Sequence, residues 1–245
     1  MRATGTILRF IYSLICYFAG VASLIYLILF ANALFLPKTV NTLIETHSFA
    51  SAFLMNILAL SLFGLQHSIM ARHSFKRWLT RFIHPDMERS TYVLSTAIVI
   101  VAMCYLWVPV GEVLWQVESE PVIFAIRTIS MLGWALMLWA SFMINHFELF
   151  GLSQTFNPML GRAQPVVRFS APGIYKLIRH PIQTGILIGI WAVPVSTTSH
   201  LMFAGGLSVY ILVGLYFEEK DLIRDFGSDY LAYKKRVKRL IPFIH

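Results

Sequence analysis

The stretch Leu177–Gly185, with the sequence LIRHPIQTG, places a cation, a titratable ring and a proline at the start of an apolar segment. Proline is well tolerated in the first turn of a helix, so we expect Pro181 to begin one. The first N–H groups of a helix and the positive end of its dipole favour anions. Arg179 can add a bidentate grip on a carboxylate or phosphate. These residue types therefore predict an anion-binding helix start.

A pair of carboxylates, Glu218 and Glu219, ends the next apolar segment. Residues 196–200 separate the two segments, and we predict a turn there. With a rise of about 1.5 Å per residue, two antiparallel helices would bring the carboxylates back beside Arg179. Together these groups predict a site for a zwitterionic ligand at one membrane surface. Alternatively, each charge only marks the end of a helix at the water interface.

The composition places these residues in a membrane protein. Of the 245 residues, 57% are hydrophobic and 13% are charged, whereas a soluble domain has roughly 25% charged residues. Several apolar runs reach the roughly 20 residues that a membrane-spanning helix needs. Cys16 and Cys104 lie in such runs without metal-site spacing, which favours two small buried hydrophobic residues. We predict an all-α, polytopic transmembrane helical bundle in one domain, residues 1–245.

Six apolar runs are candidates for membrane crossings, and they cover residues 7–36, 49–70, 91–110, 122–145, 182–195 and 201–217. The fifth run is short and contains Pro194, so both five and six spans are compatible with the sequence. Basic residues are typical of cytoplasmic loops, which places the 71–90 loop and the tail inside and the acidic 111–121 loop outside. This predicts an integral protein of the bacterial cytoplasmic membrane whose polar site faces the cytoplasm. The formal net charge of +8 is then explained by basic residues in the cytoplasmic loop and the tail. The sequence contains no nucleic-acid-binding motif.

Two parts of the chain resemble known families. The stretches GIYKLIRHPIQTG and FEEKDLIRDFGSDYLAYKKRVKRLIP resemble the C-terminal signature of integral-membrane methyltransferases of the isoprenylcysteine carboxyl methyltransferase type. The stretches LFGLQHSIMARHSFKRWLTRF, ERSTYVLSTA and INHFELFGLSQ are similar to the branch that contains the methanethiol S-methyltransferases and the related NnrU-type membrane proteins. The resemblance extends over most of the chain from Leu62 onward.

The resemblance implies that S-adenosyl-L-methionine is the methyl donor. The family binds it at the cytoplasmic face, in a pocket formed by the last helical hairpin and the C-terminal tail, here about residues 146–245. On the positions that match the motif, the implied cofactor contacts are Tyr175, Arg179, His180, Gly185, Glu218, Glu219 and Tyr230. Glu219 is expected at the ribose or the amino group. Tyr230 and Tyr233 are candidates for a lid or for interfacial anchors. Gln183 stands where many members carry Tyr, so the sequence does not predict an aromatic contact there.

The resemblance also implies methylation of a small thiol, most simply methanethiol to dimethyl sulfide. This in-line displacement requires alignment and exclusion of water, and no metal. Because the thiolate is the nucleophile, a base helps, and neutral histidine suits that task. The candidate bases are His180, His146 and His67. Polar residues near the ends of membrane helices are candidates for substrate binding, although solvation at the interface also explains them: Gln66, Asn145 and Gln154, with Glu148 beside them.

Two other hypotheses stay open. The same cofactor site could serve a larger acceptor, either lipid-like or similar to isoprenylcysteine. The chain could also be an NnrU-like transporter or haem protein, since intramembrane histidines can ligate haem. The sequence contains no CxxCH motif and no pair of histidines expected to face each other deep in two runs, which disfavours haem. The sequence does not predict an oligomeric state.

Overall fold

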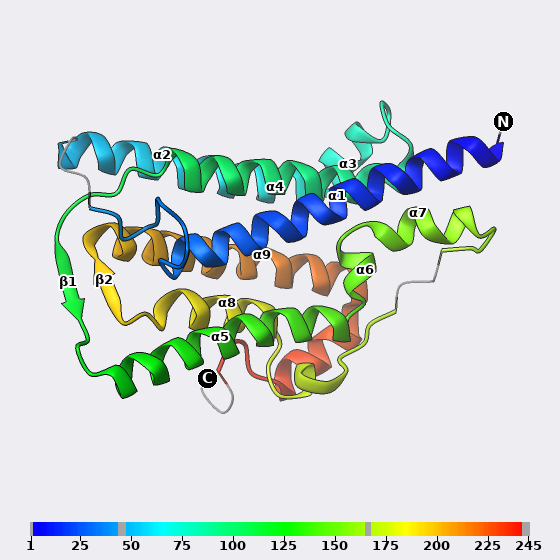
Figure 1. Cartoon of the computed structure of the whole chain (residues 1–245). Coiled ribbons are helices and arrows are strands. Elements are labelled where there is room, and N and C mark those ends of the chain that lie inside the picture. The colour runs from blue at the N-terminus through cyan, green and yellow to red at the C-terminus, as the bar shows by residue number, and fades with distance from the viewer. Residues whose placement is uncertain (1, 44–47, 165–167, 242–245) are drawn as a thin grey trace. The chain divides into compact units, whose positions relative to one another are not determined.

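The computed structural model of the chain describes residues 2–43, 48–164 and 168–241. Its long helices are α1 (Arg2–Ala31), α2 (Phe49–Ala71), α4 (Glu88–Leu106), α5 (Glu120–Met143) and α9 (Thr198–Arg236) (Figure 1). All five are long and apolar enough to cross a membrane. The chain is therefore a polytopic helical membrane protein, as its composition predicted. Pro242, the last residue of the C-terminal motif, lies outside the described residues.

The fifth predicted crossing is the short helix α8 (Pro181–Trp191), which has 11 residues. At about 1.5 Å per residue it is roughly 16 Å long, about half the thickness of the roughly 30 Å hydrocarbon core of a bilayer. By length, α8 is too short to span, and five helices in the described ranges are long enough. Pro181 occupies the first turn of α8, as predicted, and α9 begins at Thr198, within the predicted turn.

A small antiparallel sheet was not predicted. Strand β1 (Val113–Gln116) pairs with β2 (Val195–Thr197), which links α8 to α9. The Val117 amide donates a further hydrogen bond to the Pro194 carbonyl, at 3.0 Å. Strands this short have too few residues for an alternating pattern, so the acidic loop carries no strand signal in its sequence.

The chain forms two compact units. Unit 1 comprises residues 1–27, 55–107 and 145–166, and unit 2 comprises residues 28–54, 108–144 and 167–245. The shorter elements of unit 1 are α3 (His73–Leu79), η1 (Pro85–Met87), α6 (His146–Leu149) and α7 (Leu152–Met159), and unit 2 contains η2 (Gly173–Lys176). The stretch 146–245, to which the resemblance assigns the cofactor, is thus divided between the two units.

In unit 1, small residues bring α1 and the α6–α7 turn close to α4. A Cβ added to Gly20 on α1 would lie 2.7 Å from Cγ1 of Val93 on α4. Gly151 has a φ of 86°, and a Cβ there would lie 2.6 Å from the Ser90 backbone nitrogen. The Ser90 hydroxyl donates to Ser13 Oγ at 2.7 Å and to the Gly151 carbonyl at 3.0 Å. Close approach and buried hydroxyl bonds together hold these segments, as is typical of membrane helices.

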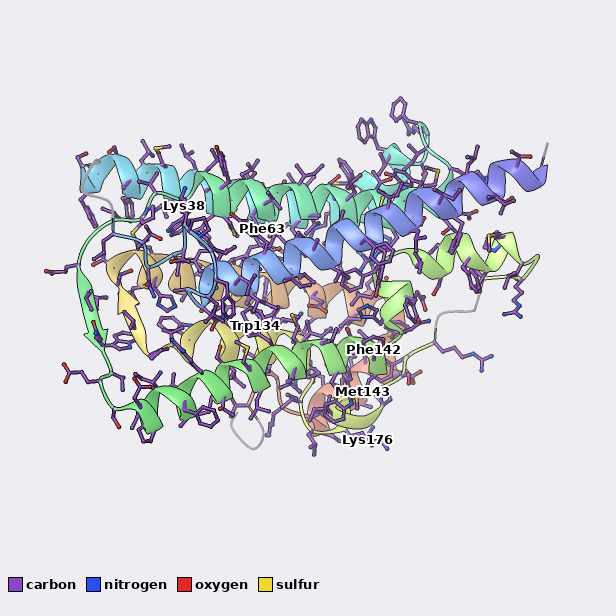
Figure 2. The ribbon with its side chains drawn as sticks, viewed as in Figure 1. Lys38, Phe63, Trp134, Phe142, Met143 and Lys176 are labelled. Carbon is purple, nitrogen blue, oxygen red and sulfur yellow. The ribbon has the colours of Figure 1, made fainter. Side chains whose placement is uncertain are left out.

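In unit 2, glycines let α8 pack directly on α5. A Cβ on Gly133 would lie 2.8 Å from the Gly185 carbonyl oxygen, and a Cβ on Gly189 would clash with the ring of Trp134, which is labelled in Figure 2. His200 Nε2 lies 2.9 Å from the Ile190 carbonyl, one of the last in α8. These contacts hold the middle and the C-terminal end of α8, and its first turn carries the candidate site.

Candidate functional site

Glu219, on α9, is the centre of a cluster of charges in unit 2. Its Oε1 accepts hydrogen bonds from Arg179 Nε at 3.0 Å and Nη2 at 2.7 Å, and it lies 3.1 Å from His180 Nε2. Lys234 Nζ is 2.7 Å from Oε2, and Arg239 Nε is 3.6 Å from Oε1. Glu219 is buried, so these partners offset the cost of removing its charge from water. The hairpin thus brings Arg-His-Pro beside the carboxylate pair, as the predicted turn required.

Arg179 is held by protein groups on two sides. Its Nε and Nη2 donate to Glu219, while Nη1 donates to the carbonyls of Lys234, at 3.2 Å, and Val237, at 2.5 Å. Its backbone N–H donates to the Lys238 carbonyl at 2.8 Å. The carboxylate that Arg179 grips is therefore Glu219. The same side chain also fastens the C-terminal segment to the start of α8.

Glu218 differs from Glu219 in exposure. Its side chain is 46% exposed, against 6% for that of Glu219. Gln183 Nε2 donates to Glu218 Oε2 at 3.3 Å, and His180 Nδ1 lies 3.9 Å from the same oxygen. Gln183, at the position where many members of the wider family carry Tyr, thus contacts this carboxylate. Glu218 is the member of the pair that is accessible from outside the cluster.

Three tyrosines pack beside these charges, and they differ in their hydrogen bonds. Tyr233 Oη donates to the Tyr175 carbonyl at 2.6 Å, and Tyr175 Oη donates to a carbonyl of α5 at 3.4 Å. Burial, with the nearby charge of Glu218, raises the pKa of Tyr175, so its hydroxyl stays protonated. Tyr230 packs with Tyr233 around the ring of Phe169. Its buried hydroxyl has no hydrogen-bond partner among the described residues.

Gly185, a predicted cofactor contact, faces α5. A Cβ at this position would lie 2.5 Å from the Gly133 carbonyl oxygen and 2.6 Å from the Met137 backbone nitrogen. Helix packing therefore accounts for the glycine. A contact between Gly185 and the cofactor stays a prediction.

His67 and Gln66, on α2, belong to a neutral polar network in unit 1. The Tyr92 hydroxyl of α4 shares a hydrogen bond with His67 Nε2 at 2.8 Å, and Thr96 Oγ1 lies 3.3 Å from His67 Nδ1. Gln66 Nε2 donates to the Met70 sulfur at 3.1 Å and weakly to Thr96 Oγ1 at 3.4 Å. The Gln66 Oε1 atom is buried and unpaired within the described part of the chain, so it can accept a hydrogen bond from a small ligand.

His146, Asn145 and Gln154 lie around α6 in the same unit. The His146 ring is buried, with Nε2 3.1 Å from the Tyr17 hydroxyl, and this burial lowers its pKa. Asn145 has a φ of 82° and caps α6 by accepting from the Glu148 amide at 3.2 Å. Gln154 Nε2 donates to the Glu148 carbonyl at 3.0 Å, and its buried Oε1 has no partner in the described ranges. Asn145 therefore has a structural task, whereas Gln154 retains an acceptor.

The structure brings four predicted residues into direct contact in unit 2: Arg179, His180, Glu218 and Glu219. The predicted residues of unit 1 form the two groups around His67 and His146. Sequence reasoning missed Lys234 and Arg239, because a basic tail usually indicates solvated residues. It also missed Tyr92, although its spacing of four from Thr96 places both on one face of α4.

Comparisons with known proteins identify the family. A family model described as NnrU protein matches residues 55–240. Methanethiol S-methyltransferase 1 of Bradyrhizobium diazoefficiens is 42% identical over 96% of this chain and 82% of its own length. Methanethiol S-methyltransferase of Mycobacterium tuberculosis is 39% identical over 97% of each chain, and Nurim of Sus scrofa is 31% identical over 66% of this chain and 65% of its own. No solved structure matches the chain. The chain therefore belongs to the NnrU protein family, among relatives that carry the name methanethiol S-methyltransferase.

Proposed function

We propose that this protein is an S-adenosyl-L-methionine-dependent thiol S-methyltransferase that converts methanethiol to dimethyl sulfide. The observation that carries the proposal is its identity, over nearly the whole chain, with proteins named for that reaction. The charged cluster of unit 2 supports it, because it joins a half-exposed carboxylate to a surplus of cations. The whole chain acts as a single domain in this proposal.

The residues of unit 2 fit the cofactor. S-adenosyl-L-methionine carries a carboxylate, an ammonium group and ribose hydroxyls, and when bound it supplies a methyl group on a sulfonium. The accessible carboxylate of Glu218 is complementary to such groups, and so is the Tyr230 hydroxyl, which has no hydrogen-bond partner among the residues described. His180 and Tyr175 line the same cluster, while Arg179 and Glu219 hold its parts in place.

The protein must also prepare the thiol. Because the thiolate is the reactive form, a neutral histidine is needed to accept the proton. Among His67, His146 and His180, we favour His67, since its neighbour Gln66 has a buried oxygen, Oε1, that accepts no hydrogen bond from the residues that the structure describes. That oxygen can accept a hydrogen bond from S–H and so orient the acceptor. The network lies on α2 and α4, which are apolar enough to cross a membrane, and a lipid environment would keep water away from the thiolate.

The charge distribution supports the location that we propose. In this proposal the protein resides in the bacterial cytoplasmic membrane with its charged cluster on the cytoplasmic side, because the 71–90 loop and the tail are rich in basic residues. Its partners in this proposal are the lipid bilayer and the small thiol.

Headspace gas chromatography tests the reaction. Cells expressing the chain and fed methanethiol should release dimethyl sulfide above the empty-vector level. Glu218→Ala should abolish this at equal protein abundance, whereas the control Asp225→Ala, an exposed acid on the same helix, should not. Absence of dimethyl sulfide together with absence of S-adenosyl-L-methionine binding would contradict the proposal. Absence of dimethyl sulfide with normal binding of S-adenosyl-L-methionine would instead indicate that the methyl acceptor is a larger molecule.

A further inference from the structure

Two donor atoms in the charged cluster of unit 2 are buried without a hydrogen-bond partner in the described part of the chain. Tyr230 Oη and Arg239 Nε make no hydrogen bond to any described residue. An unpaired buried donor destabilises a protein, and native structures rarely retain one unless a ligand or water completes it. Arginine can only donate, and a phenol readily does so. The cluster therefore lacks an acceptor.

Glu219 does not supply that acceptor. Its two oxygens already receive Arg179, His180 and Lys234. Arg239 Nε remains 3.6 Å from Oε1, which is too long for a hydrogen bond. The Tyr230 hydroxyl makes no hydrogen bond to Glu219 or to any other described residue.

The charges of the cluster identify the kind of acceptor. Arg179, Lys234 and Arg239 face the carboxylates of Glu218 and Glu219. Asp221, a third acid whose charge acts on Glu218, is paired with Arg224 at 3.1 Å. One positive charge is thus left over, so the missing acceptor is an anion. A carboxylate has the size and geometry to accept from a guanidinium and a hydroxyl together.

We propose that Tyr230 and Arg239 bind the carboxylate of the methionine moiety of S-adenosyl-L-methionine. This inference rests on the proposed function and names the residues that bind the carboxylate end of the cofactor. The Arg-His-Pro motif predicted Arg179 for that task, but Arg179 is committed to Glu219 and to the carbonyls of the C-terminal segment. Arg179 is thereby a positioning residue. Glu218, with its exposed oxygen, is placed for the ammonium group of the same ligand.

Binding to the purified full chain in detergent micelles tests the assignment. Isothermal titration calorimetry compares S-adenosyl-L-methionine with its decarboxylated analogue, which keeps the amine and lacks only the carboxylate. Tyr230→Phe should weaken binding of the first by about ten- to a hundredfold, as expected for a lost hydrogen bond to a charged group. Its affinity for the analogue should stay at the wild-type value. Arg239→Gln should likewise weaken binding of S-adenosyl-L-methionine more than binding of the decarboxylated analogue.

Tyr233→Phe is the matched control. The Tyr233 hydroxyl donates a hydrogen bond to the Tyr175 carbonyl. Removing this hydroxyl should lower the melting temperature of the free protein and leave unchanged the ratio of the affinities for S-adenosyl-L-methionine and its decarboxylated analogue. Tyr230→Phe should not lower the melting temperature of the free protein, because the Tyr230 hydroxyl makes no hydrogen bond to any residue in the described ranges.

An unchanged affinity ratio in Tyr230→Phe, or an equal loss for both ligands, would overturn the assignment while leaving the proposed function intact. A wild-type protein that binds neither ligand would overturn both.

Discussion

The two units contain polar groups of opposite character. In unit 2, one buried carboxylate, Glu219, holds two arginines, a lysine and a histidine near the end of the apolar part of α9. In unit 1, His67, Tyr92, Thr96 and Gln66 form a chain of neutral hydrogen bonds between two membrane helices. The cluster in unit 2 is held together by the charge of Glu219, whereas the network in unit 1 consists of separate hydrogen bonds between neutral groups.

This difference follows from the cost of burying charge. A full charge inside the bilayer is expensive, so ionic clusters gather where helices reach water. Neutral hydroxyl, amide and imidazole groups can bond across membrane helices, each with a small effect on stability. We therefore expect substitutions in unit 2 to affect folding strongly and substitutions in unit 1 to affect mainly chemistry.

Glu219→Gln should produce the largest loss of stability. The substitution leaves Arg179 buried without its counter-ion, and breaking a buried pair costs about 3 kcal/mol. We expect a lower melting temperature in detergent and early aggregation in size-exclusion chromatography. Glu218→Gln, at the half-exposed neighbour, should unfold close to the wild-type temperature. Equal stability of the two variants would show that the cluster does not depend on Glu219.

Gly185→Ala should be the next largest effect. The new methyl group would lie 2.5 Å from the Gly133 carbonyl, and such overpacking costs about 1–3 kcal/mol. The control is Gly205→Ala on α9, where a Cβ meets nothing within 4 Å. That change should leave stability unchanged or raise it slightly, since Ala favours helix. A stable Gly185→Ala protein would contradict the direct packing of α8 on α5.

Tyr92→Phe should test the neutral network. Hydrogen bonds between membrane helices contribute on average about 0.6 kcal/mol, so the melting temperature should hardly move. His67→Ala should be similarly stable but lose about a hundredfold in dimethyl sulfide production, as expected for a missing general base. Full activity of a folded His67→Ala protein would transfer that role to His146 or His180.

The pH dependence of stability should show the smallest effect. Burial lowers the pKa of His146, so the folded protein resists a proton that the unfolded chain accepts below about pH 6.5. The contribution of His146 to the free energy of unfolding is therefore present above that pH and is lost as the pH falls. The melting temperature of the wild type should therefore fall as the pH is lowered from 7.5 to 5. The fall should be smaller in His146→Gln. An identical slope in the variant would show that His146 does not contribute.

Much of the fold was predictable because its signals are local. Apolar length predicted the long helices, Pro181 predicted the start of α8, and equal lengths on both sides of the 196–200 turn predicted that Arg179 meets Glu219. The β1–β2 pair was not predictable, because it joins two short segments far apart in sequence. The last helical segment of α9, which runs to Arg236 after a break at Gly227, also has no hydrophobic signal.

Sequence alone thus determined the class of protein, the family and most of the polar residues involved, since composition, proline position and motif spacing are properties of the chain itself. Only the tertiary structure decided how each polar group is used. It assigned Arg179 to Glu219, left the Tyr230 hydroxyl without a hydrogen-bond partner among the described residues, and brought Lys234 and Arg239 of the basic tail to Glu219. The physical reason is that a hydrogen bond is settled by distances between groups remote in sequence, which spacing along the chain does not encode.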